Sequence, residues 1–263
     1  MTTVTTVKIM TNMKAMITTK AYLRAGVLCF GFLMFLGCQS DSKLSAEAII
    51  EKTIQAHGGI EKWQDVKQLS FDKSVTLFNE DGSTEISTDQ FQLFRFGEKL
   101  FVKLEWEQEG NDMQIIYEND KVTKMVNDSI VTNEAELARA ENAVFAAHYV
   151  VCQPFDLLKS GATLTLDETI THNGKECYVI KVNYPGDDED ADQWYYIIDP
   201  DSFEVVANQV VLTDHTSWVE NLTYDDQTDF QFNSHRKSYR LNEVGEKTYL
   251  RAEYFYENYS VEY

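Results

Sequence analysis

The stretch VKQLSFDKSVTLFNEDGSTEISTDQFQLFRF, residues 66–96, decides how this chain folds. Its first half alternates between two sets of residues, a period of two that is typical of a β-strand with one buried face. The positions on the mostly apolar face are Leu69, Phe71, Lys73, Val75 and Leu77. Turn-forming residues gather at 79–83, and a second strand-like run follows from Thr84 to Phe96. The stretch therefore predicts a β-hairpin.

The same hairpin rhythm continues to the end of the chain. Asn173-Gly174 is the strongest short hairpin signal, because these two residue types tolerate the positive φ that a tight turn requires. Further strand-like runs occupy residues 100–106, 113–118, 121–126, 162–172, 175–184, 194–198, 203–212, 215–224, 230–241 and 247–259. We therefore predict a mostly β (α+β) fold, a curled antiparallel sheet or incomplete β-barrel of about eleven strands.

Two segments break this rhythm and predict helices. Residues 45–57 carry apolar side chains at helical spacing, begin at the potential N-cap Ser45, and end at Gly58-Gly59. The segment Asn133–Leu158 begins with an Ala-rich run that lacks Gly and Pro, which favours a helix. Pro154 either ends this helix or opens another. The fold thus has an N-terminal helix and a mid-chain helical insert.

The first 37 residues have the composition of a secretory signal. They contain no acidic residue, and a positively charged region precedes the apolar run Ala25–Leu36. This run of about 12 residues is shorter than the roughly 20 that a membrane-spanning helix needs. Translation could start at Met1, Met13 or Met16, and the two later starts give a more ordinary signal length.

The apolar run ends in Phe35-Leu36-Gly37-Cys38, which resembles the lipobox of bacterial lipoproteins. The resemblance implies cleavage before Cys38 and acylation of that cysteine, although Phe35 stands where Leu is usual. We therefore predict a signal peptide at 1–37, a tether at 38–44 and a single domain at 45–263. The alternative is an uncleaved N-terminal anchor that happens to contain a cysteine. Both interpretations place the protein at a membrane surface. The first makes it lipid-anchored in the bacterial cell envelope.

The chain is strongly acidic, with a formal net charge of −20 at pH 7. This charge argues against a nucleic-acid partner, whose phosphates need a basic surface. It also argues against docking on anionic lipid by charge, so the acyl chains would provide the membrane attachment. The sequence does not identify a protein partner.

Several motifs together resemble a known group of proteins. The lipobox is followed by a helix ending in Ala-His57-Gly58-Gly59-Ile60-Glu-Lys-Trp63, and a strand then begins at Val66-Lys67-Gln68-Leu69. The hairpin entered at Trp194–Pro200 and the closing strand Tyr254–Tyr259 fit the same group. This pattern is similar to bacterial outer-membrane lipoproteins of the LolA/LolB-like superfamily, and more narrowly to an uncharacterised lipoprotein family of that fold.

The resemblance implies an incomplete antiparallel barrel that is concave and apolar inside, with the helices acting as a lid. Superfamily members of known role bind lipid or lipoprotein acyl chains. No ligand-binding motif of the lipoprotein carriers is present, so no binding residue is transferred from them. Since one fold serves many functions, the function itself does not follow from the resemblance.

Three strands offer apolar faces that we predict to line a ligand cavity. The candidate lining residues are Leu100, Val102, Leu104, Trp106, Tyr178, Ile180, Val182, Trp194 and Tyr196. An ordinary core between sheet and helix would show the same pattern, because it also needs an apolar inner face. We favour the cavity because the family resemblance implies it.

Cysteine and histidine residues offer few signs of chemistry. Cys152 and Cys177 could form a disulfide in an oxidising compartment, or remain separate buried thiols. His148 lies one helical turn before Cys152, but we interpret both as packing residues. His57 beside Gly58 is best explained as a helix C-terminus. Without HExxH, CxxC or a nucleophile elbow, the sequence predicts no metal site, cofactor or catalytic residue.

These observations leave three functional hypotheses. The first is a non-enzymatic envelope lipoprotein that binds a lipid or other hydrophobic ligand in its half-barrel, gated by the Asn133–Leu158 insert. The second is a structural or interaction lipoprotein that acts through a protein partner. The third is an envelope hydrolase, which no sequence motif supports. We expect the outer membrane as the location, facing the periplasm or the surface.

Overall fold

The computed structural model describes residues 44–159, 161–186 and 191–263, so the predicted signal and Cys38 lie outside the described part. The helices are α1 (Ala46–Ala56), α2 (Ile60–Asp65) and α3 (Glu134–Cys152). The first strands are β1 (Gln68–Phe78), β2 (Thr84–Arg95), β3 (Phe101–Gln108), β4 (Asn111–Glu118), β5 (Lys121–Val126) and β6 (Ser129–Ile130). The later strands are β7 (Thr163–Leu166), β8 (Ile170–His172), β9 (Lys175–Asn183), β10 (Gln193–Ile198), β11 (Val205–Val211), β12 (Thr216–Tyr224), β13 (Asn233–Leu241) and β14 (Lys247–Glu262).

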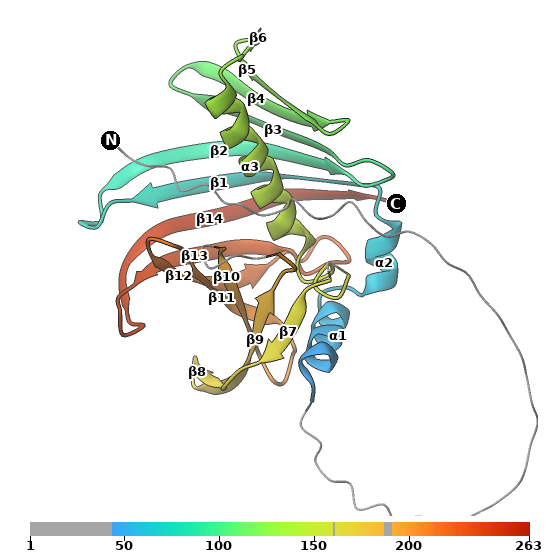
Figure 1. Ribbon diagram of the computed structural model, residues 1–263, viewed down its shortest axis with the longest axis vertical. Coiled ribbons are helices and arrows are strands. Elements are labelled where there is room, and N and C mark those ends of the chain that lie inside the picture. Colours follow the sequence, from blue (N-terminus) through green and yellow to red (C-terminus); the bar gives the residue numbers. More distant parts are fainter. Residues whose placement is uncertain (1–43, 160, 187–190) are drawn as a thin grey trace, which may run out of the picture.

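The described strands form one curled antiparallel sheet of fourteen strands (Figure 1). Along the sheet the order is β6-β5-β4-β3-β2-β1-β14-β13-β12-β11-β10-β9-β7, and β8 pairs with β9 off this path. Because β6 and β7 are edges that do not pair with each other, the sheet does not close into a barrel. The predicted class, a mostly β fold with a curled antiparallel sheet, is confirmed.

The predicted hairpin at 66–96 is the pair β1 and β2. Leu69 lies opposite Phe94, Leu77 lies opposite Ile86, and Asn79 N donates to Ser83 O across the turn at 2.8 Å. The alternation has the expected effect near the start of β1, where the side chains of Leu69 and Phe71 are buried in the core.

The two ends of the domain meet in the middle of the sheet. Strand β1 pairs with β14 so that Gln68 lies opposite Glu262, and Lys67 N donates to Glu262 O at 2.7 Å. The first and last strands are therefore central neighbours, and they join a sheet half built from β1–β6 to one built from β7–β14.

Helix α1 begins where Ser45 Oγ accepts a hydrogen bond from Ala48 N at 3.2 Å, as its N-cap position predicts. It buries Ile49, Ile50 and Ile54. The chain then turns through Gly58 and Gly59, whose φ angles are +124° and +91°. These angles lie in the region that favours glycine. The turn brings in α2, whose Trp63 ring stacks on Phe155 with a centroid separation of 4.5 Å.

Helix α3, the predicted helical insert, begins at the N-cap Asn133, whose Oδ1 accepts from Glu136 N at 3.0 Å. It crosses the strands of the sheet and covers one of its faces (Figure 1). Its own residues Ala140 and Val144 are buried. The helix ends just before Gln153-Pro154, so Pro154 follows the helix rather than opening a second one. None of the described helices is long and apolar enough to cross a membrane.

The sheet has more strands than the sequence predicted, for two local reasons. The segment 162–172 is interrupted at residues 167–169, so that its parts form β7 and β8 on the same partner, β9. The two-residue strand β6 is too short to show any periodicity.

The apolar side chains form two clusters. The large cluster lies between the sheet, α1, α2 and α3, while a small cluster around Cys177, Ile197, Ala207 and Trp218 is packed by Ile170 of β8. Both clusters and all the described strand pairs are built from residues after 43. We therefore expect the predicted domain 45–263 to fold without the residues before it.

Candidate functional site

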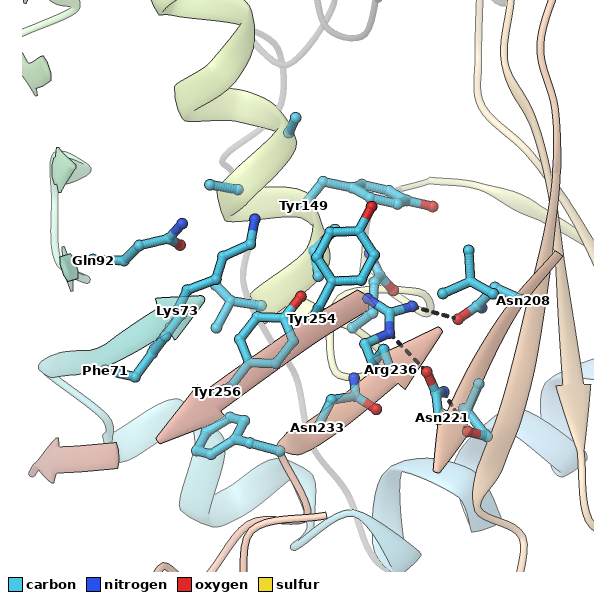
Figure 2. A pocket seen from close by; sticks show the side chains of 18 of the residues that line it. Phe71, Lys73, Gln92, Tyr149, Asn208, Asn221, Asn233, Arg236, Tyr254 and Tyr256 are labelled. Carbon is cyan, nitrogen blue, oxygen red and sulfur yellow. Dashed lines mark hydrogen bonds between the residues drawn. The ribbon is translucent and has the colours of Figure 1, made fainter. Parts of the chain in front are cut away.

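A cavity of about 420 Å³ lies between the curled sheet and the C-terminal half of α3. On the helix side its walls are short side chains, among them Ala143, Ala146 and Ala147, which leave space above the sheet. On the sheet side the lining comes from strands of both halves, including β1, β2, β13 and β14 (Figure 2). A volume of this size is within the range of small-molecule sites.

Aromatic rings form much of the wall. Phe232 stacks on Tyr259 with a centroid separation of 4.9 Å, and Tyr259 lies at the same distance from Phe71. On the far side, Trp194 packs against Tyr149 of α3 at 4.9 Å. Such rings offer a large apolar contact area to a ligand.

A buried arginine stands among these rings. The side chain of Arg236, on β13, is only 7% exposed and lines the cavity. Its Nε donates to Asn221 Oδ1 at 2.8 Å and its Nη2 donates to Asn208 Oδ1 at 3.1 Å (Figure 2). Both partners are neutral amides, so the described chain supplies hydrogen bonds to this cation but no opposite charge.

A second cation reaches the same cavity from β1. Lys73 on β1 lies opposite Tyr256 on β14. Two residues earlier on β14, Tyr254 lies opposite Arg236 on β13. The Lys73 Nζ sits 5.5 Å from the centroid of the Tyr254 ring. In Figure 2 the Lys73 ammonium and the Arg236 guanidinium flank this tyrosine. The strand register therefore places two positive charges on one cavity.

The charge of the cavity contrasts with that of the whole chain. The formal net charge of the protein is −20, yet no aspartate or glutamate is among the described residues that line the cavity. The lining residues with neutral amide side chains are Gln90, Gln92, Gln153, Asn208, Asn221, Gln231 and Asn233. The cavity is therefore apolar on much of its wall, polar in one region, and positive.

Tyrosine hydroxyls form a hydrogen-bonded chain at one side of the cavity. Tyr184 donates to the Tyr149 hydroxyl at 3.1 Å, and the Tyr149 and Tyr196 hydroxyls are 3.0 Å apart. Burial raises the pKa of Tyr149 and of Tyr196 well above the ordinary value. Both phenols therefore stay protonated at neutral pH and can act as donors.

Unpaired polar atoms are concentrated at this wall. Four cavity-lining residues have a buried side-chain atom without a hydrogen-bond partner in the described chain: Gln153 Oε1, Trp194 Nε1, Asn208 Nδ2 and Asn233 Oδ1. A buried polar atom without a partner costs about 1–3 kcal/mol. Such a concentration is more typical of a binding site than of a packed core.

The structure brings some of the predicted lining residues to the cavity and leaves others in the core. Leu104, Trp194 and Tyr196 line the cavity. The remaining six pack in the large cluster away from it, with Val102, Ile180 and Val182 fully buried and Leu100, Trp106 and Tyr178 partly buried.

The sequence-based prediction missed both cations and the tyrosines of β14. For Lys73 a signal was present, since this residue shares the strand face of Leu69 and Phe71 in the quoted stretch. A charge on an otherwise apolar strand face indicates either an unusual environment or a functional site. Arg236 showed a similar signal, because it lies an even number of residues after Phe230 and Phe232 and so would share a strand face with them.

His57 serves the fold, as its position at the end of α1 predicted. Its Nδ1 donates to Gln231 O at 3.1 Å, and its Nε2 accepts from Val205 N at 3.2 Å. The side chain is buried, and burial lowers the pKa of His57 to about 4. A neutral imidazole thus ties α1 to β11 and to the loop before β13.

The thiols have no nucleophilic environment. The Cys152 Sγ lies 3.3 Å from His148 Nε2. However, burial raises the pKa of Cys152 well above its ordinary value and lowers the pKa of His148, so both groups remain neutral. Cys152 and Cys177 are both free in the structure and belong to different apolar clusters. The described residues hold no His, Cys, Asp and Glu cluster suited to a metal ion.

Comparison with solved structures defines the class to which this fold belongs. The chain is similar to a LolA superfamily protein, NE2245, from Nitrosomonas europaea, with a TM-score of 0.54 at 9% sequence identity over 83% of this chain and 94% of the other. It is also similar to a DUF1329 family protein from Desulfovibrio piger, with a TM-score of 0.53 at 8% identity over 82% of this chain and 93% of the other. This chain therefore shares its overall fold with these two proteins.

The sequence comparison then gives the particular family. The model of a family of unknown function, DUF6503, matches residues 26–258, and the chain belongs to this family. No curated protein sequence matches it. The resemblance inferred from the motifs, to an uncharacterised family with a LolA-like fold, is therefore confirmed.

Proposed function

We propose that this protein is a lipid-anchored envelope protein that binds a lipid or another hydrophobic ligand in the cavity beneath α3, without catalysing a reaction. The observation that carries the proposal is the cavity of about 420 Å³ between α3 and the sheet, with aromatic and alanine walls. Direct packing of α3 on the sheet along its whole length would leave no space of this size between them.

Removal of apolar surface from water would supply the binding free energy. Each Å² of ligand surface that leaves water contributes roughly 25 cal/mol. Helix α3 forms one wall, so a movement of the Asn133–Leu158 insert would open a path for the ligand. The small side chains at Ala143, Ala146 and Ala147 determine how much space the closed position leaves.

The lipoprotein part of the proposal rests on the sequence. Cleavage of residues 1–37 and acylation of Cys38 would attach the domain to a membrane through the tether 38–44. We place the protein in the outer membrane, in keeping with the motifs that resemble outer-membrane lipoproteins.

The direct test is a search for bound lipid. Residues 39–263 would be secreted to a bacterial periplasm and purified without detergent. Organic extracts would then be analysed by mass spectrometry beside those of a variant with a filled cavity, Ala147→Trp. Ala138→Trp is the matched control, because Ala138 is exposed on the same helix and does not line the cavity.

A lipid present in stoichiometric amount in the wild-type domain and the Ala138→Trp control, and reduced in Ala147→Trp, supports the proposal. The proposal is contradicted if the protein carries no lipid and also fails to bind added fatty acids and phospholipids in native mass spectrometry. That outcome would favour a structural lipoprotein acting through a protein partner.

A further inference from the structure

The Arg236 cation is buried without an opposite charge in the described chain. Its guanidinium is always protonated at physiological pH. Removing an ion from water is costly unless an opposite charge compensates, and the two amide oxygens that it contacts carry only partial charge. No carboxylate of the described residues forms an ion pair with Arg236, although several acids on the outer surface pair with lysines.

The hydrogen bonds of this guanidinium are also incomplete. Arginine has five N–H donors, and the described chain engages one at Nε and one at Nη2. The other three have no partner there. Asn208 and Asn221 fix the plane of the group, so the free donors are held in a set orientation on the cavity wall (Figure 2).

Other groups near this point favour a negatively charged ligand. The Lys73 ammonium lines the same cavity and forms no ion pair within the described chain. The amide Nδ2 of Asn208 is buried without an acceptor. Two positive charges and an unpaired amide donor therefore line the sheet side of the cavity, whereas α3 contributes mainly alanine and valine side chains to the opposite wall.

We infer that the ligand is an amphiphile with an acidic headgroup, a carboxylate or a phosphate, that binds Arg236 and Lys73 while its apolar chain lies against α3. This inference rests on the proposed ligand-binding function and specifies the ligand class. Carboxylates and phosphates match the planar donor set of arginine, and their charge completes the ion pair that the protein lacks.

The test compares ligands that have the same chain and different headgroups. Dodecanoate, dodecyl phosphate and dodecanol would be measured at neutral pH by equilibrium dialysis against residues 39–263, after delipidation. We expect both acids, or one of them, to bind about 10- to 100-fold more tightly than the alcohol, as a charge-assisted hydrogen bond predicts. A preference for the carboxylate indicates a fatty acid, and a preference for the phosphate indicates a phospholipid-like ligand.

Variants then assign the preference to the cavity. Arg236→Met should remove most of the preference for acids over dodecanol, and Arg236→Lys should retain part of it. Lys73→Met should reduce it. Arg240→Met is the matched control, since Arg240 lies on the same strand, binds Ser217 and does not line the cavity. Retained dodecanol binding shows that a variant is folded with its cavity intact.

The outcomes separate the two proposals. If wild-type protein binds all three ligands equally, or if Arg236→Met keeps the full preference for acids, this inference is wrong and the proposed function stands. If the wild-type protein binds none of the three, both proposals fail.

Discussion

Gly58 lies directly against Phe230: a Cβ added to Gly58 would stand 2.6 Å from Phe230 Cδ1 and 2.7 Å from the Asp229 carbonyl oxygen. The glycine ends α1, and the phenylalanine belongs to the segment that leads into β13. This close approach lets the helix dock on the sheet, with the Trp63 ring packed edge-on against Phe230 at 5.7 Å.

Gly58→Ala should therefore destabilise the protein. The new methyl group meets backbone as well as side chain, and the φ of +124° is unfavourable for any L-residue. We expect a loss of about 1–3 kcal/mol in the free energy of unfolding, measured with urea. Gly82→Ala is the control, because Gly82 also has a positive φ (+83°) but a Cβ there would meet no atom within 4 Å, and this change should cost less. Equal losses at the two positions would contradict the packing explanation.

The burial of His57 should make stability depend on pH. Its pKa falls from 6.5 to about 4 on folding, so between these values the unfolded state binds more protons. The contribution of His57 is fully present above pH 6.5 and is lost as the pH falls toward 4, by about 3 kcal/mol in total. Urea unfolding across this window should show a steeper decline in the wild type than in His57→Leu.

The His57→Leu variant is also expected to be less stable at neutral pH, because it loses the hydrogen bonds to Gln231 and Val205. Only the slope of stability against pH tests the titration of His57. Parallel curves for the two proteins between pH 4 and 6.5 would show that His57 is accessible to protons in the folded state.

The two thiols should be present in reduced form and protected. In residues 39–263 the cysteines are Cys152 and Cys177, both buried and free. We expect an alkylating reagent to label neither of them rapidly in the native protein and both in urea, without prior reduction. Mass spectrometry counts the labels. A protein from an oxidising compartment that gains labels only after reduction would instead contain a disulfide.

The predicted anchor is tested on the full-length chain. Cys38→Ser should abolish incorporation of labelled palmitate and move the protein from the membrane fraction to the soluble fraction in a bacterial host. Cys29→Ser is the matched control within the signal, and it should leave both properties unchanged. Membrane attachment that survives Cys38→Ser would favour the alternative of an uncleaved anchor.

Local sequence signals predicted most of the fold. Asn173-Gly174 joins β8 to β9 as expected, and both residues have positive φ. Ser45 caps α1 as expected, and α3 begins directly after Asn133, where the sequence placed the start of the helical insert. The path of the sheet could not be predicted, because the pairing of β1 with β14 joins residues that are far apart in the chain. Hydrophobic periodicity indicates which face of a strand is buried, but it does not indicate which other strand pairs with it.

The site was less predictable for the same reason. Apolar alternation led to Leu104, Trp194 and Tyr196, but it led equally to Val102 and Ile180, which pack in the core. Apolar alternation along a strand does not distinguish the wall of a cavity from a filled core. The two cations come from strands on either side of β14, so their meeting depends on a register that no local motif encodes.

The placement of β1 beside β14 has a consequence for biosynthesis. Strand β1 obtains its second neighbour only after β14 has been synthesised, and contacts between such distant residues form slowly. The sheet therefore cannot be completed while residues 247–262 are still to be made. For a chain that is exported as we propose, this order would favour an unfolded precursor during synthesis. A premature stop before Lys247 would leave β1 as an open edge, prone to pair with other chains.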